Sequence, residues 1–206
     1  MLKKMMLAAV AVLMLAACGS KETQVCADFG NNAPDRVRVT VGDKIDTTVP
    51  VIDGKFEIEV PVDLTTMAHA RAGSSVYSFV SDGSKITLDP KDGKAYSNKK
   101  GVHSRYVEYT KWMDDFLAAY RKEVEALGDD QDAADALFKE RQAEYIEFHK
   151  ETIKANKDNI LGLTALRQIE NDDAKEMLSL INSFSSGMRK LPELVELKKS
   201  YEEDLK

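Results

Sequence analysis

Three histidines and a row of glutamates are the residues of this sequence whose chemistry includes metal binding. His69, His103 and His149 lie far apart, and none belongs to a His-Glu-x-x-His motif. The residue three positions before His149 is Ile146, so the Glu-x-x-His pattern of carboxylate-bridged metal helices is absent as well. Glutamates do recur every three or four residues along the same segment: Glu140, Glu144, Glu147 and Glu151. Basic residues are interleaved with them: Lys139, Arg141, Lys150 and Lys154. We therefore expect a solvated, salt-bridged helix face, with no metal or cofactor site.

Motifs for nucleophilic catalysis and phosphate binding are also missing. Ser74 does not lie in a Gly-x-Ser-x-Gly sequence, and Gly54-Lys55 and Gly93-Lys94 lack the spacing of a phosphate-binding loop. No Cys-x-x-Cys is present, which excludes a dithiol redox centre of that type. Cys26 follows Val25 in an expected strand, where a half-buried, unreactive thiol is favoured over a reactive one. The sequence predicts no catalytic residue, and we expect that the protein is not an enzyme.

The second cysteine, Cys18, lies in a very different context. Lys3 and Lys4 precede an apolar run over residues 7–15, which is too short to cross a bilayer as a stable helix. The run ends in Leu15-Ala16-Ala17-Cys18-Gly19. This arrangement resembles the lipobox of bacterial lipoproteins, in which the leader is cut before the cysteine and the cysteine is acylated, for example with palmitate. The resemblance implies a signal peptide at residues 1–17, a tether at 18–23 and lipidation of Cys18.

An acylated Cys18 predicts where the protein is held. Two or more acyl chains anchor a protein stably, so we expect attachment to the cell membrane or outer membrane without a spanning segment. The residues after Cys18 carry no acidic run, which favours the periplasmic side over the cell surface. The net charge of −6 argues against nucleic acid as a partner, because phosphates require clustered Lys and Arg.

Residues 24–98 carry the signals of short β-strands. Val37, Val39 and Val41 alternate with polar residues, which is typical of a strand with one buried face. Asp53-Gly54 and Asp82-Gly83 each separate two apolar runs, so we expect a hairpin at each, and Asp92-Gly93 marks a third turn. Pro50 and Pro61 indicate edge positions or strand ends. Six to eight such strands predict a small antiparallel sandwich or barrel.

The periodicity changes to that of helices in residues 99–206. One expected helix ends at Gly128, with Asp129 or Asp130 capping a second that runs over residues 132–155. Asn159 precedes a short helix, Asp172 or Asp173 caps another, and Pro192 begins the last. The side chains expected to face inward on the second helix are Leu137, Phe138, Tyr145, Phe148 and Ile153. With strands first and about four to five helices after them, the predicted fold class is α+β.

An aromatic stripe on the first helix has two interpretations. It consists of Tyr106, Tyr109, Trp112, Phe116 and Tyr120. These side chains either form a core against the sheet or line a ligand groove, and the core is favoured because apolar helical stripes usually bury. Trp112 falls slightly off the main seam, where a position at the rim is expected.

The whole pattern resembles one family of exported lipoproteins. The lipobox, the strand segments VIDGKFEIEVPV (51–62) and YSFVSDGSKITL (77–88), and the long helices are similar to Bacteroidetes-type lipoproteins with a β-rich N-terminal domain of unknown function. In many members a thioredoxin-like, thiol:disulfide interchange domain follows. The stretch IKANKDNILGLTAL (153–166) is similar to the family's segment between two helices. This sequence reaches Lys206 without a Trp-Cys-x-x-Cys motif, so the thioredoxin domain is expected to be missing and its activity does not carry over.

Three functions remain open on these grounds. The leading interpretation is a membrane-anchored cell-envelope lipoprotein that acts as a non-catalytic binding or scaffold module for a partner protein or envelope component. The second is an accessory factor to a separate thioredoxin-like oxidoreductase. The third is a small-ligand carrier with a cavity between sheet and helices.

Overall fold

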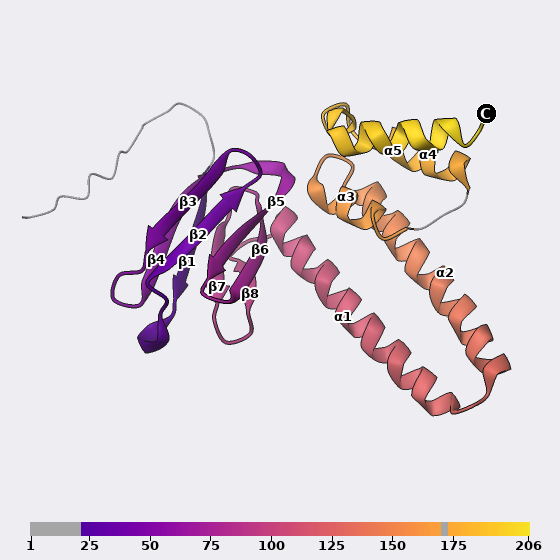
Figure 1. Ribbon diagram of the computed structural model, residues 1–206, viewed down its shortest axis with the longest axis horizontal. Coiled ribbons are helices and arrows are strands. Elements are labelled where there is room, and N and C mark those ends of the chain that lie inside the picture. The colour runs from indigo at the N-terminus through magenta and orange to yellow at the C-terminus, as the bar shows by residue number, and fades with distance from the viewer. Residues whose placement is uncertain (1–21, 170–172) are drawn as a thin grey trace, which may run out of the picture.

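The computed structural model describes residues 22–169 and 173–206, and it shows an α+β fold (Figure 1). Eight strands come first and form two sheets; five α-helices and a short 3-10 turn follow. The last strand ends at Ser97 and the first helix begins at Val102. None of the helices in these two ranges is long and apolar enough to cross a membrane. Cys18 and the expected leader of residues 1–17 lie outside the described residues.

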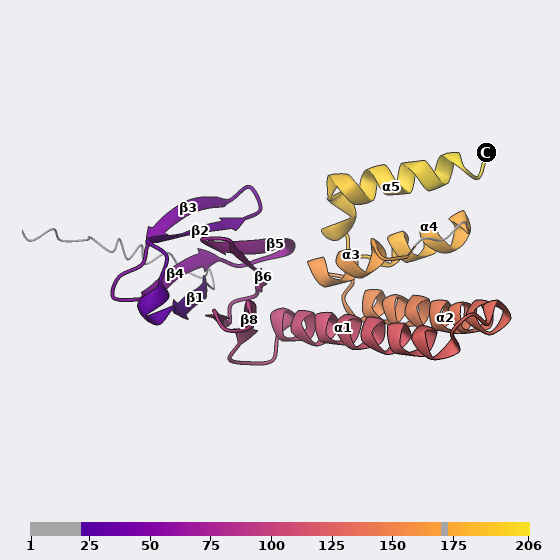
Figure 2. The ribbon, with the colours of Figure 1, turned by 60° about the horizontal axis from the view of Figure 1, so that its bottom comes forward.

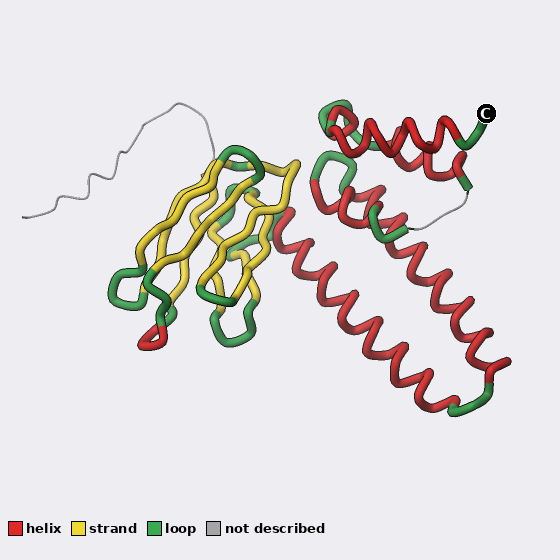
Figure 3. Tube along the Cα trace, in the orientation of Figure 1, coloured by secondary structure: helices red, strands yellow, loops and turns green. Residues whose placement is uncertain are grey.

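The strands pack as a sandwich of two four-stranded sheets (Figure 3). Sheet A has the order β4-β1-β7-β8 and sheet B the order β3-β2-β5-β6. The bounds are β1 Glu22–Asp28, β2 Arg36–Val41, β3 Ile45–Pro50, β4 Lys55–Pro61, β5 Asp63–Ala72, β6 Ser75–Ser81, β7 Lys85–Asp89 and β8 Lys94–Ser97. The first strand thus begins at Glu22, within the segment expected to be a tether.

The sandwich core forms because each strand turns one face inward. Val37, Val39 and Val41 of β2 are fully buried, and Tyr77 and Phe79 of β6 are buried beside them. The alternation expected for the valine strand is therefore confirmed. All neighbouring strands in the two sheets run antiparallel except β1 and β7, which pair in parallel from Gln24–Lys85 to Ala27–Leu88.

The turns at Asp53-Gly54 and Asp82-Gly83 are real, but the two hairpins expected there are wrong. Asp53 and Gly54 have positive φ angles of 51° and 76°, as a tight turn requires. However, β3 pairs with β2 and β4 pairs with β1, so this turn passes from sheet B to sheet A. Asp82-Gly83 likewise joins β6 of sheet B to β7 of sheet A. Of the three Asp-Gly turns, only Asp92-Gly93 closes a hairpin, between β7 and β8. A turn signal fixes local φ angles but not the partner of each strand.

Pro50 and Pro61 lie at strand ends, as the sequence predicts. Pro50 is the last residue of β3 and Pro61 the last residue of β4, and both strands are sheet edges. A proline at such a position removes no ladder hydrogen bond that the sheet needs.

The helices begin and end where capping residues predict. Their bounds are α1 Val102–Leu127, α2 Gln131–Ala155, α3 Ile160–Leu166, α4 Ala174–Ser183 and α5 Pro192–Glu203. Gly128 ends α1 with φ at 58°. The side chains of Asp130, Asn159 and Asp173 accept hydrogen bonds from the first turns of α2, α3 and α4. Pro192 occupies the first turn of α5, as expected.

The helices divide into a packed base and a projecting arm. Helices α3 and α4 pack against α2, and α5 packs against α4; their apolar faces form one core that includes Ile153 of α2, Val80 of β6 and Val102 of α1. The distal parts of α1 and α2, residues 111–147, project together away from the sandwich and are called the arm (Figures 1 and 2). Phe138, expected to face inward, is 52% exposed on the arm. That expectation is wrong because this stretch of α2 has little besides α1 to pack against.

Candidate functional site

Two of the three histidines are buried and serve the fold. His103, in the first turn of α1, accepts a hydrogen bond from the backbone N–H of Val80 at Nδ1 and donates from Nε2 to the carbonyl of Ala95, at 3.3 and 3.0 Å. A backbone N–H only donates and a carbonyl only accepts, so the ring is neutral with its proton on Nε2. Burial lowers the pKa of His103 more than the Ala95 bond and the Asp82 charge raise it. The ring thereby ties α1 to strands of both sheets.

The buried ring of His149 has the opposite tautomer. Its Nδ1 donates to the carbonyl of Tyr145 at 2.7 Å, so Nε2 accepts from the hydroxyl of Tyr109 at 3.0 Å. Burial lowers the pKa of His149 and raises that of Tyr109. This pair joins α1 to α2 at the base of the arm.

The remaining histidine, His69, is exposed on sheet B beside Ser78, with its Nδ1 3.1 Å from the serine hydroxyl. The structure therefore keeps the three imidazoles in separate places. Across residues 22–169 and 173–206, no three His, Cys, Asp or Glu side chains lie close enough together to hold a metal ion. Cys26 is a free, half-buried thiol on β1, with its sulfur 3.8 Å from the hydroxyl of Thr87.

Two of the four glutamates singled out on α2, Glu144 and Glu147, are paired with basic residues. Arg141 binds Glu144 on its own helix and reaches across the arm to Glu123 of α1, with Nε 2.8 Å from Oε2. Lys154 lies 4.0 Å from Glu147. Lys150 pairs with Glu176 of α4 rather than with a residue of its own helix. A salt-bridged face is confirmed for these residues, and the bond to Glu123 holds the two helices of the arm together.

The aromatic stripe of α1 is buried in part against the sheet and mostly against α2. Tyr106 packs toward β6, where its pKa is raised by burial despite a hydrogen bond with Ser78. Trp112 stacks on Phe148 of α2 with ring centroids 3.5 Å apart and on Phe116 at 4.9 Å. The core expected against the sheet is therefore correct for Tyr106, whereas Trp112 and Phe116 pack between the two helices. Trp112 is half-buried and lines a hollow of about 390 Å³ with Tyr109 and Phe148.

A cleft of about 520 Å³ separates sheet B from helices α3 and α5. Its floor is apolar, with Met67, Ile160, Leu163 and Leu191, and two ion pairs lie at its rim. Lys44 lies 2.8 Å from the buried carboxylate of Asp63, and Nε of Arg167 lies 2.6 Å from Oε1 of Glu193. Burial raises the pKa of Asp63, but the bonds from Lys44 and Thr65 outweigh it and hold that pKa below its usual range. A cavity between sheet and helices is what the third interpretation, a small-ligand carrier, requires.

Neither ion pair at the cleft was foreseen from the sequence. Lys44 lies in the β2–β3 turn and Asp63 begins β5, while Arg167 and Glu193 belong to different helical segments. Residues so far apart carry no spacing signal, because only the tertiary fold brings them together.

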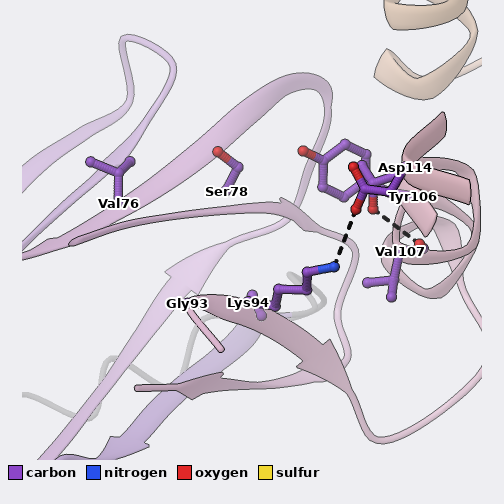
Figure 4. Close-up of a pocket in the computed structure, with 9 residues that line it drawn as sticks. Val76, Ser78, Gly93, Lys94, Tyr106, Val107 and Asp114 are labelled. Carbon is purple, nitrogen blue, oxygen red and sulfur yellow. Dashed lines mark hydrogen bonds and ion pairs between the residues drawn. The ribbon is translucent and has the colours of Figure 1, made fainter. Parts of the chain in front are cut away.

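A smaller hollow of about 220 Å³ lies where α1 crosses β6 and β8 (Figure 4). Tyr106 and Val107 come from the helix, Val76 and Ser78 from β6, and Lys94 from β8. Lys94 reaches Asp114 across the hollow, with Nζ 3.4 Å from Oδ2. The geometry offers hydroxyl groups and one ion pair, which is suited to polar binding rather than to a metal.

Comparison with known proteins adds no relative. No known protein family, no curated protein sequence and no solved structure matches this chain.

Proposed function

We propose that this protein is a lipid-anchored lipoprotein of the bacterial cell envelope whose folded body is a non-catalytic binding or scaffold module. The leader of residues 1–17 is removed, Cys18 carries the acyl chains, and the body faces the periplasm. The observation that carries the proposal is the Leu15–Gly19 motif after a basic start and a short apolar run. The proposed kinship with Bacteroidetes-type lipoproteins rests on the same motif and on the strand and helix segments that follow it.

The start of β1 supports a close attachment of the body to the bilayer. Only four residue steps separate Cys18 from Glu22, the first residue of β1. A chain extends at most roughly 3.3–3.6 Å per residue, so the anchor lies within about 14 Å of the sandwich. On this proposal the sandwich is the membrane-proximal part of the body.

The arm supports a protein partner. Three large apolar side chains are exposed along it: Leu117, Val124 and Phe138. Residues 123–135, at its tip, contain six carboxylates and no lysine or arginine. An apolar surface bordered by one sign of charge favours a partner of complementary charge. We therefore infer that the arm binds a partner protein whose contact surface has an apolar patch with a basic rim.

Fatty-acid labelling tests the anchor. Cells that express the full chain receive a fatty acid with a clickable alkyne, and the purified protein is examined for label and mass. The wild type and Cys26→Ser are expected to carry label, and Cys18→Ser is expected to carry none. Label on Cys18→Ser, or an intact leader on the wild type, would contradict the proposal.

Affinity capture tests the arm. The intact protein is purified from envelope extracts beside Phe138→Glu, with Ile52→Glu as the matched control because Ile52 is 64% exposed on the sandwich. A partner that binds the arm is lost with Phe138→Glu and retained with Ile52→Glu. Equal recovery from both variants would remove the arm from the proposal. If the recovered protein is thioredoxin-like, the accessory role replaces the scaffold.

The cleft between sheet B and the α3–α5 base favours one second candidate, a small-ligand carrier. Its volume of about 520 Å³ lies within the range of small-molecule sites, and its floor is apolar with polar groups at the rim. Native mass spectrometry distinguishes the two functions, since a carrier retains a bound small molecule of constant mass.

A further inference from the structure

The outward face of sheet B gathers three arginines in a protein whose net charge is −6. Arg36 and Arg38 alternate with buried valines on β2, and Arg71 is on β5. The register places Arg38 directly opposite Arg71. Like charges at directly opposed positions of neighbouring strands repel and weaken the sheet. The stability of the sandwich therefore gives no reason for this pairing.

Only one of the three guanidinium groups is neutralised by a neighbour. Asp46 of β3 binds Arg38, with Nε 2.8 Å from Oδ1, and the bond raises the pKa of Arg38. Within the part of the chain that the structure describes, the side chain of neither Arg36 nor Arg71 has an ion pair or a hydrogen bond. Both side chains are exposed and available to an external anion.

The face is hollowed where the arginines meet. A cavity of about 340 Å³ is lined by Arg38, Thr40, His69, Arg71 and Val76, without a carboxylate among them. Burial and the charge of Arg71 lower the pKa of His69, so its ring is neutral at pH 7. The uncompensated positive charge in the cavity comes from Arg71, because Arg38 is paired with Asp46, and hydroxyl and imidazole groups border it.

The hollow continues on both sides of the arginines. Val76 also lines the hollow under α1, and the other residues that line this second hollow include Ser78, Lys94 and Tyr106 (Figure 4). His69 also lines the cleft toward α3 and α5. The three hollows adjoin one another through these shared wall residues, and we treat them as one groove across sheet B. The two flanking hollows also hold carboxylates, of which Asp114, Asp63 and Glu193 are each paired with a lysine or arginine. Such a groove is suited to an elongated ligand rather than to a single small ion.

We propose that the arginine face, meaning this groove together with the neighbouring exposed Arg36 of β2, binds an acidic polysaccharide of the cell envelope. Carboxylate groups of the polymer bind Arg36 and Arg71, whose planar guanidinium groups match a carboxylate with two parallel hydrogen bonds. Sugar hydroxyls bind Thr40, Ser78 and Tyr106. This assignment rests on the proposed function, because it places the protein where such polymers are found.

Two other occupants fit the face less well. A peptide that extends the sheet pairs with the backbone of an edge strand, whereas the arginines project from β2 and β5, which are both interior in the order β3-β2-β5-β6. A flat bilayer reaches the exposed arginines but not Ser78 and Tyr106, which lie in the hollow under α1. The polysaccharide satisfies both the charge and the shape.

Calorimetric titration of the intact, detergent-solubilised lipoprotein tests the assignment, with the polyuronate alginate as the probe and neutral dextran as its control. Alginate is expected to bind in a salt-sensitive manner and dextran not to bind. Each lost charged hydrogen bond weakens binding about tenfold or more, so Arg36→Gln/Arg71→Gln is expected to bind at least about a hundredfold more weakly. Arg121→Gln, which removes an exposed arginine of the arm, is the matched control and retains wild-type affinity.

Equal binding of alginate by the wild type and the double variant would overturn the proposal, as would equal binding of dextran. Circular dichroism of the double variant establishes that it is folded. Flotation with vesicles of anionic and neutral phospholipid forms the second arm. If the arginines control vesicle binding and not alginate binding, the occupant is a membrane and the polysaccharide is excluded. Fatty-acid labelling of the same samples keeps the anchor separate, because a wild-type protein that is acylated on Cys18 but does not bind alginate contradicts only the arginine face.

Discussion

The hydrogen bond between Tyr109 and His149 gives the sharpest test of how the arm is held to the rest of the protein. Both side chains are buried, and the tyrosine hydroxyl lies 3.0 Å from Nε2 of the imidazole. Tyr109→Phe leaves that nitrogen without a donor, and His149→Phe leaves the hydroxyl without an acceptor. A buried polar atom left unpaired costs about 1–3 kcal/mol, so each variant is expected to lose that much stability. The variant with both substitutions leaves neither atom unpaired.

The double variant is therefore expected to lose much less than the sum of the two single variants. A coupling energy of about 1–3 kcal/mol follows, because removal of both partners abolishes the penalty of the second atom. Urea unfolding at pH 7.5, followed by circular dichroism, gives the four free energies of unfolding. The ring stacking of Phe148 on Tyr109, at 5.7 Å, is available to phenylalanine as well and so is common to all four proteins. Additive losses would refute the tautomer and the hydrogen bond assigned to His149.

Three further predictions follow from the same geometry. His103 and His149 are buried as neutral rings with lowered pKa values, so below pH 6.5, the ordinary histidine pKa being about 6.5, the unfolded chain binds more protons than the folded protein. Stability is therefore expected to fall as the pH drops from 7 toward 5, by at most about 1.4 kcal/mol per pH unit for each ring. Urea titrations at several pH values measure this change. Gly162→Ala places a methyl group against a backbone carbonyl of the α2–α3 turn and is expected to cost about 1–3 kcal/mol, whereas Gly187→Ala meets open space and should leave the melting temperature unchanged or slightly higher. Arg71→Gln removes a like-charge pair and is expected to stabilise the sandwich by about 0.2–1 kcal/mol in urea; a loss of stability would show that the arginine serves the fold.

Local features of the fold could be predicted from the sequence, and distant pairings could not. Helix ends at Gly128, Asn159 and Pro192 follow from caps within a few residues of each end. The Asp53-Gly54 turn was equally readable, yet its two flanking strands belong to different sheets. The parallel pair of β1 and β7 joins segments about sixty residues apart. The alternation of apolar and polar residues along a strand does not indicate which other strand it pairs with.

The same limit applies to the candidate sites. The stripe on α1 correctly indicated a buried face, but the periodicity of one helix does not say whether a sheet or another helix covers it. His149 bonds to a tyrosine 40 residues away, which no local motif announces. The arginines of β2 alternate with valines, which predicts that they lie on the outward face of the strand. Only the strand register shows that Arg71 of β5 lies opposite Arg38 on that face.

Residues 24–98 and 99–206 differ in secondary structure, but they share a core. Val80 of β6 is fully buried in the same apolar cluster as Ile153 and Leu161 of the helices, and Leu64 and Met67 of β5 pack against that cluster. His103 adds hydrogen bonds from the first turn of α1 to β6 and β8. Separation of the two parts would expose this apolar surface and leave a buried imidazole unpaired, so the strands and the helical base stabilise one another. The arm is the exception, because beyond Trp112 its helices are held chiefly by each other and by the bond from Arg141 to Glu123. The sandwich and the helical base thus share one core, whereas the arm depends mainly on contacts between its own two helices.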